Sequence, residues 1–375
     1  MSVMEKVIRF FQNEIVLCVA FVLAFVSCLF VHPDKAYIDY IDYRTLSILL
    51  CLMITMAGLQ RLSVFRQIGE YLVNQMSSVR SVAFVLIFLC FFSSMWITND
   101  VALITFVPFS IVTLSLAKRK DLFIPVIVLD TIAANLGSML TPLGNPQNLF
   151  LYSKANMSFV SFVKLMLPYS LLSLALLIIA TFFFIKKEAL EAPKNNAYKR
   201  TMHEKFLIAL YLVYFLLSIL VVVRFIDYRI GLLLILGFTL INDRRILRKP
   251  DYSLLFTFIF LFVFIGNMKR IPALNEMLYQ MIANKEVIVS VFLSQFISNV
   301  PAAILCSGFT EHMDRLIIGT NLGGLGTLIA SMASLISFKQ YGFVEGADKK
   351  RYLVFFTVLN AVFLLVLLLF YSFVN

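Results

Sequence analysis

Four short polar clusters interrupt the apolar sequence of this chain, and their residue types are suited to binding small ions. Oxygens of Asn, Ser and Thr, with carbonyls left free where a helix breaks, can bind Na⁺, and free N–H groups at a helix start attract anions. The clusters contain no Lys or Arg, so neutral groups would have to hold a bound anion. The candidate residues for binding a solute or ion are Thr98, Asn99, Asp100, Thr141, Gly144, Asn145, Gln147, Asn148, Ser298, Asn299, Thr327, Ser331 and Ser334.

The clusters occur in the same order in both halves of the chain. The tripeptide Asn-Leu-Gly at 135–137 returns 186 residues later at 321–323. Each copy follows a shorter polar cluster, Ile-Thr-Asn at 97–99 and Ile-Ser-Asn at 297–299. Paired interruptions at corresponding places in two halves indicate the binding site of a transporter. The alternative is a pair of helix kinks, caused by prolines in the first copy, that only shape the packing.

Two acids lie deep in these apolar elements, Asp100 and Asp130. An ionisable residue inside a membrane is a functional candidate by default, because burying its charge is costly. Both are therefore candidate coupling acids, which would bind H⁺ or a cation during transport. The alternatives are that Asp100 caps a helix and that Asp130 only hydrogen-bonds a neighbouring element. Val300 stands at the place of Asp100 in the second half.

The composition predicts a membrane protein with many spans. The chain is 61% hydrophobic and 14% charged, whereas a soluble domain is about one quarter charged. Its net charge of +11 comes from basic residues in short loops between apolar runs, as the positive-inside rule expects. A nucleic-acid partner is therefore not expected, and the predicted partners are the lipid bilayer and a small-molecule or inorganic-ion substrate.

No resident cofactor is expected. The five cysteines lack metal-ligand spacing, and the three histidines flank or lie outside the expected spans. The bound ion expected here is a coupling ion, either H⁺ or Na⁺. A Na⁺ site is placed at Asn99, Asp100, Gly144 and Asn145.

The expected fold is an all-α polytopic membrane protein made of two inverted-topology repeats. Each repeat holds a re-entrant helical hairpin followed by a broken transmembrane helix, and a charged cytoplasmic linker with one span joins the repeats. The expected boundaries are 1–185 for the first repeat (hairpin about 81–117, broken helix about 122–157), 186–223 for the linker and its span, and 224–375 for the second repeat (hairpin about 286–310, broken helix about 316–338).

The charges flanking the first hairpin decide the expected orientation. Both flanks of 81–117 are basic and should be cytoplasmic, so the segment must enter and leave on one side. A hairpin with its tip at 98–100 satisfies this, and so would two complete spans. The flanks of 286–310 are balanced in charge, which suits the outer side. We expect a protein of the cytoplasmic membrane with its N-terminus in the cytoplasm and its C-terminus outside.

Three motifs resemble those of the ion transporter superfamily, which includes arsenite-permease/NhaD antiporters, citrate transporters and divalent anion:sodium symporters. They are Thr-Asn-Asp-Val-Ala at 98–102, Thr-Pro-Leu-Gly-Asn-Pro-Gln-Asn at 141–148 and Ser-Asn-Val-Pro-Ala at 298–302. The chain looks most like the YbiR-type anion permeases. The resemblance implies an inverted-repeat fold with two re-entrant hairpins, often a homodimer that works by an elevator motion.

The same resemblance implies roles for the hairpin tips. In the symporters of the superfamily, Ser-Asn-Thr tips bind substrate and Na⁺, and the matching positions here are 98–100 and 298–300. Both third positions depart from Thr, which argues against a dicarboxylate substrate. The second break, at 330–334, lacks the prolines and the final Asn of the family motif, so its ion site is expected to be weak or absent.

The sequence thus favours secondary active transport of a small anionic solute coupled to Na⁺ or H⁺ by alternating access. The main alternative is a Na⁺/H⁺ antiporter that uses Asp100 and Asp130. An enzyme is not expected, since no span pairs a nucleophile with a base. A channel is a further alternative, whereas an ATP-driven pump would need a partner subunit, because the chain has no Gly-x-x-x-x-Gly-Lys loop.

Overall fold

The computed structural model describes residues 14–189 and 201–374, and the fold is given for these residues only. They form α-helices joined by short 3₁₀ turns, with one isolated β-bridge and no strand in the described ranges. The all-α prediction is therefore confirmed. The expected cytoplasmic start of the chain and the middle of the expected linker lie outside the described residues.

The helices run along the chain in two series. The first comprises α2 (Ile15–Phe30), α3 (Ala36–Asp39), α4 (Tyr43–Arg61), α5 (Val64–Val73), α6 (Val79–Ile97), α7 (Asn99–Leu116), α8 (Phe123–Gly137), α9 (Pro146–Lys154) and α10 (Phe159–Phe184). The second comprises α11 (Met202–Val222), α12 (Tyr228–Asn242), α13 (Tyr252–Arg270), α14 (Pro272–Ile282), α15 (Glu286–Ile297), α16 (Asn299–Cys306), α17 (Met313–Leu322), α18 (Met332–Tyr341) and α19 (Lys349–Val374).

Eight of the described helices are long and apolar enough to cross a membrane. They include α4 and α13, each of which starts at an aspartate whose carboxylate accepts a backbone N–H. Asp42 accepts from Thr45, and Asp251 accepts from Leu254, so two polar caps fix where these apolar helices begin. The chain is therefore a multi-pass membrane protein.

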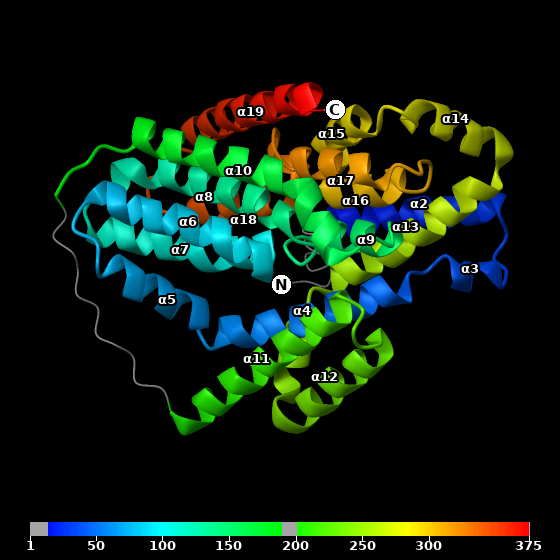
Figure 1. Cartoon of the computed structure of the whole chain (residues 1–375), viewed down its shortest axis with the longest axis horizontal. Coiled ribbons are helices and arrows are strands. Elements are labelled where there is room, and N and C mark those ends of the chain that lie inside the picture. Colours follow the sequence, from blue (N-terminus) through cyan, green and yellow to red (C-terminus); the bar gives the residue numbers. More distant parts are fainter. Residues whose placement is uncertain (1–13, 190–200, 375) are drawn as a thin grey trace, which may run out of the picture.

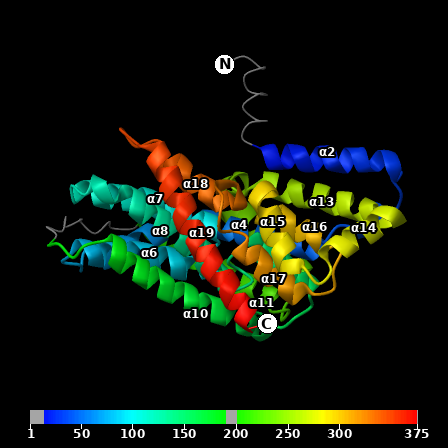
Figure 2. The ribbon, with the colours of Figure 1, turned by 90° about the horizontal axis from the view of Figure 1, so that it is seen from above.

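The helices pack as two groups that meet along α4 and α13. Helix α2 lies along α13, and α11 and α12 pack on α4 (Figures 1 and 2). The second group contains α6–α8 and α10 with α15–α19, and α9 and α16 carry its contacts with α4 and α13 respectively. The candidate site residues fall almost entirely in this second group.

The order of elements from α4 to α10 returns from α13 to α19. In each series a long helix and a short helix precede two helices joined at a one-residue tip, a broken helix and a final long helix. The arms differ in length, since α6 and α7 have 19 and 18 residues whereas α15 and α16 have 12 and 8. By length alone, the arms of the first pair could each cross a membrane, and those of the second pair could not.

The first helix break begins earlier than expected. Within the broken helix expected at about 122–157, the proline-containing motif predicts the break over 141–147, but α8 ends at Gly137 and a 3₁₀ turn (Ser138–Leu140) follows. Extended backbone at Thr141 and Asn145 then leads to α9, which begins at Pro146. Proline suits this first helical position because its missing N–H would have no partner there.

Candidate functional site

The two tips share an uncommon backbone conformation. Thr98 between α6 and α7 has φ 67° and ψ 147°, and Ser298 between α15 and α16 has φ 71° and ψ 154°. This region is normally occupied by glycine, and holding another residue there costs about 1–3 kcal/mol. The same strain at both expected tips indicates that the surrounding contacts force the chain to reverse there.

The first tip is bound to the first break. The Asn99 backbone N–H donates to the Gly144 carbonyl at 3.1 Å, and its side-chain amide donates to Asn135 Oδ1 at 3.0 Å. The Thr141 hydroxyl donates to the carbonyl of Met95, three residues before the tip. Helix α7 therefore starts against the break that follows α8.

The second tip is bound to the second break by corresponding groups. The Thr327 hydroxyl donates to the Gln295 carbonyl at 3.0 Å, and Gln295 is again three residues before the tip. The Ser298 hydroxyl lies 3.5 Å from the carbonyl oxygen of Ala330, which stands where Gly144 stands in the first copy. The Gln295 side chain also accepts from the Thr327 N–H at 2.9 Å. The sequence repeat thus corresponds to a repeat of contacts.

Two asparagines join the halves to each other. The Asn135 side-chain amide donates to the Ser334 hydroxyl at 3.2 Å, and its oxygen accepts from the Ser331 hydroxyl at 3.0 Å. Its counterpart Asn321 donates to Asn148 Oδ1 at 2.7 Å. Sequence reasoning did not select Asn135 and Asn321 as site residues, although their place in the repeated Asn-Leu-Gly tripeptide was the available signal.

The first break is packed closely around Gly144 and Gln147. A Cβ added at Gly144 would lie 2.1 Å from the carbonyl oxygen of Ser138, so only glycine fits there. Gln147 is fully buried, and neither of its amide atoms has a hydrogen-bond partner among the described residues. Such unpaired groups are costly unless something binds them, so Gln147 is a candidate ligand.

A cavity of about 480 Å³ reaches the first tip from one end of the molecule. Thr98, Asp100 and Asn145 line its inner part, between apolar residues of α4 and α18. Lys249, Asp251 and Lys339 also line it, so both cationic and acidic groups share this cavity with the polar ones. Asp100 is half-buried, and its carboxylate makes no hydrogen bond among the described residues. The alternative that Asp100 caps helix α7 is therefore not supported by a capping hydrogen bond.

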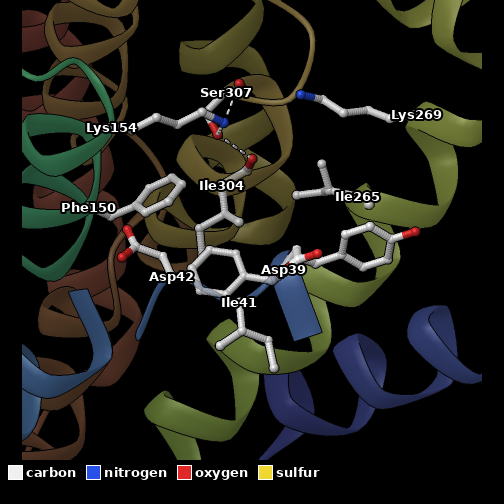
Figure 3. A pocket seen from close by; sticks show the side chains of 12 residues that line it. Asp39, Ile41, Asp42, Phe150, Lys154, Ile265, Lys269, Ile304 and Ser307 are labelled. Carbon is white, nitrogen blue, oxygen red and sulfur yellow. Dashed lines mark hydrogen bonds between the residues drawn. The ribbon is translucent and has the colours of Figure 1, made fainter. Parts of the chain in front are cut away.

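A second cavity, of about 360 Å³, lies at the other ends of α4 and α13. Figure 3 shows the Lys154 and Lys269 side chains on one side of it, near Ser307, with Asp42 opposite. Lys154 Nζ donates to the Ser307 carbonyl at 2.6 Å and hydroxyl at 2.9 Å, which ties α9 to the end of α16. None of the candidate site residues lines this cavity.

The candidate residues therefore fall into three sets. Thr98, Asp100 and Asn145 face the large cavity. Thr327 is exposed at the far edge of the second break. The others are buried, and all but Gln147 lie in or next to the contacts between the tips and the breaks: Asn99, Thr141, Gly144, Gln147, Asn148, Ser298, Asn299, Ser331 and Ser334.

Comparisons with known proteins show which family the chain belongs to. The family model described as citrate transporter matches residues 3–315, and the chain belongs to this family. An uncharacterized transporter of Methanocaldococcus jannaschii is 36% identical over 68% of this chain and 69% of its own length. The inner membrane protein YbiR of Escherichia coli is 30% identical over 81% of this chain and 82% of its own. The predicted superfamily is confirmed, and the family and the Methanocaldococcus relative are named as transporters, which supports the prediction that the chain is a transporter and not an enzyme.

A shorter match extends to a plant protein. The silicon efflux transporter LSI3 of rice is 30% identical over 37% of this chain and 28% of its own length. Membrane transport is therefore a property of the family.

Proposed function

We propose that this chain is a secondary active transporter of the cytoplasmic membrane that moves a small anionic solute, coupled to Na⁺ or H⁺. The observation that carries the proposal is the meeting of two strained tips and two helix breaks, with the first tip open to a cavity of about 480 Å³. Polar side chains there, with Lys249 and Lys339 lining the same cavity, would bind the anion. Asp100 and Asp251 also line this cavity and would bind the coupling cation or proton.

The contact pairs support a fold of two inverted repeats with re-entrant hairpins at 98 and 298. Corresponding residues make corresponding bonds: Thr141 and Thr327 to the helix before each tip, and Asn135 and Asn321 to the opposite half. In our proposal the large cavity opens to the cytoplasm, because Lys249, the last residue of the basic loop at 244–249, lines it. The N-terminus would then be cytoplasmic and the C-terminus outside.

The alternating-access step would be a sliding of the group with both breaks along α4 and α13. Cavities at opposite ends of these two helices favour this elevator-type motion, since movement in one direction would close one cavity and open the other. A homodimer, with α4 and α13 in a fixed central part, belongs to the same proposal. The alternative function is Na⁺/H⁺ exchange, which Asp100 in the open cavity favours.

Thermal unfolding of the purified protein tests the proposal. The panel is Na⁺, Li⁺, K⁺, several pH values, citrate, sulfate, phosphate, arsenite and silicic acid, the last because of the rice relative. A ligand at one hundred times its dissociation constant adds about 2.7 kcal/mol of stability. We expect one anion to raise the unfolding temperature more in Na⁺ or at low pH than without the coupling ion.

Matched variants locate the effect. Asn145→Ala, which removes a side chain from the cavity wall, should abolish the anion shift. Asn242→Ala, at the exposed end of α12, should keep it. Cation and pH shifts with no response to any anion would instead support Na⁺/H⁺ exchange, and no response to any of these ligands would contradict both proposals.

A further inference from the structure

Asp130 is a fully buried acid in the middle of α8. One carboxylate oxygen, Oδ2, accepts a hydrogen bond from the Ser110 hydroxyl of α7 at 2.7 Å. The other oxygen, Oδ1, has no partner among the described residues. The titratable groups that face Asp130 are Cys90 of α6 and Tyr352 of α19, and both are ordinarily neutral at pH 7.

No cation compensates this acid in the described part of the chain. None of the ion pairs found there includes Asp130, and its side chain is 0% exposed. An isolated ionised carboxylate in such a site costs far more than one hydrogen bond returns, and in practice the group becomes neutral. The arrangement is therefore that of a carboxylic acid that holds its proton.

The second half shows what a compensated acid looks like. There Thr310, at the end of the second arm, donates to Glu286 Oε1 at 2.8 Å, much as Ser110 donates to Asp130. The Asn284 N–H also donates to Glu286 at 2.9 Å, and Arg315 lies 3.8 Å from its other oxygen. The Glu286 carboxylate thus accepts two hydrogen bonds and lies near a guanidinium, whereas the Asp130 carboxylate accepts one hydrogen bond, from a hydroxyl.

The hydrogen bond to Asp130 comes from a segment of α7 that is able to bend. Pro108, two residues before Ser110, lies inside α7 and cannot donate to the carbonyl four residues earlier. Pro108 and Phe109 line a cavity of about 230 Å³ against α4 and α5. Ser110 and Asp130 do not line this cavity, so its water would reach the acid only after a bend at Pro108 that separates Ser110 from Asp130.

We infer that Asp130 is a proton-binding site, separate from the solute site, whose proton is exchanged with water during each transport cycle. The inference rests on the proposed transport function and makes H⁺ the coupling ion. Asp130 lies five residues before Asn135, or about 7.5 Å along the helix at 1.5 Å per residue. Its charge would therefore be felt by the asparagine that joins the two halves.

Infrared spectroscopy of the reconstituted full chain at pH 7 tests the protonation directly. A protonated carboxyl and a carboxylate absorb at different positions, so subtracting the Asp130→Asn spectrum from that of the wild type isolates this one side chain. We expect the difference to contain a protonated carboxyl band and no carboxylate band. Glu286→Gln is the matched control, and its difference spectrum should contain carboxylate bands.

Ser110→Ala keeps the experiment decisive if Asp130→Asn does not fold. That variant should retain the protonated carboxyl band at a shifted position, because the hydroxyl no longer donates to it. A carboxylate signal from Asp130 in the wild type at pH 7 overturns the inference. So does an unshifted carboxyl band in Ser110→Ala.

Proton flux separates this inference from the function proposed above. Vesicles with an entrapped pH indicator receive external citrate or phosphate as the probe anion, or a Na⁺ gradient. We expect proton entry in the wild type and its loss in Asp130→Asn, and flux that persists in Asp130→Asn overturns the inference. A protonated Asp130 without any flux or anion response would contradict the transport proposal and the coupling role, while the proton-binding site itself would stand.

Discussion

The two halves of this protein make corresponding contacts around their helix breaks, but they differ in which tip residues line a cavity. The first tip, with Thr98 and Asp100, lines the large cavity, whereas Ser298 and Asn299 at the second tip are buried. The buried acid of the first half is uncompensated, and that of the second half faces an arginine. The two halves therefore share one set of contacts, and under the proposed function their differences assign solute binding to the first half and a supporting role to the second.

The glycines before the breaks give the largest expected difference between the halves. A Cβ at Gly137 would lie 2.0 Å from the backbone oxygen of Phe91, whereas at Gly323 the nearest atom is the Ser294 hydroxyl oxygen at 2.6 Å. Since overpacking typically costs about 1–3 kcal/mol and more where backbone is struck, Gly137→Ala should lose about 3 kcal/mol or fail to fold. Gly323→Ala should lose about 1 kcal/mol, as read from unfolding in detergent.

A second substitution sharpens this contrast. Ser294→Ala should partly restore Gly323→Ala, because it removes the nearest obstructing atom. Ser94→Ala should not restore Gly137→Ala, because the Phe91 carbonyl stays in place. Equal rescue in both halves would mean that the two packing sites are equivalent and that the comparison is wrong.

Much of the fold could be predicted from sequence. The apolar runs, the repeated Asn-Leu-Gly and the polar tips predict an all-α membrane protein with two interrupted elements, since helix periodicity and breakers are local signals. The start of the first break was missed because the prolines at 142 and 146 are the stronger breaker signals, whereas α8 already ends at Gly137 and continues as a 3₁₀ turn. The expected hairpins and inverted orientation stay predictions.

The contacts across the halves could not be predicted. The bonds from Asn135 to Ser331 and Ser334 join residues almost 200 positions apart, and their pairing depends on how the helices pack. The exposure of Thr327 could not be predicted for the same reason, because its sequence motif matches that of Thr141, which is buried. A repeat in sequence therefore locates candidate residues without showing which of them face the solute.

The strained tips predict a smaller effect of opposite sign. Replacing Thr98 by glycine relieves about 1–3 kcal/mol of backbone strain in the folded state. Glycine also makes the unfolded chain more flexible, which costs about 0.4–1 kcal/mol, so the net stability should rise by about 1 kcal/mol. Ser298→Gly also loses the contact with the Ala330 carbonyl and should be close to neutral. Unfolding in urea measures both variants.

The apparent affinity for solute in a transport assay tests whether the Thr98 hydroxyl also binds the solute. Thr98→Gly should then lower apparent affinity despite its higher stability, and Thr98→Ser, which keeps the hydroxyl, should retain it. If Thr98→Gly destabilises the protein, the strain argument fails for the first tip.

A difference of similar size is expected at the ends of α4 and α13, where each half places an arginine beside an aspartate and a tyrosine. Arg61 and Tyr211 both donate to Asp243, whose side chain is 9% exposed, and Arg270 pairs with Asp34, which is 44% exposed. Burial alone would raise the pKa of Asp243, but the bonds from Arg61 and Tyr211 outweigh it and hold that pKa below its ordinary value.

This lowered pKa fixes the sign of the pH dependence. Asp243 contributes stability above the ordinary aspartate pKa of about 4, and the contribution is lost as pH falls through its lower native value. We expect Asp243→Asn to cost about 1–2 kcal/mol near pH 7, and the gap to the wild type to narrow in acid. Asp34→Asn should cost under about 1 kcal/mol, because the pair is exposed and screened. If the two variants cost the same at every pH, burial does not distinguish these two arginine pairs.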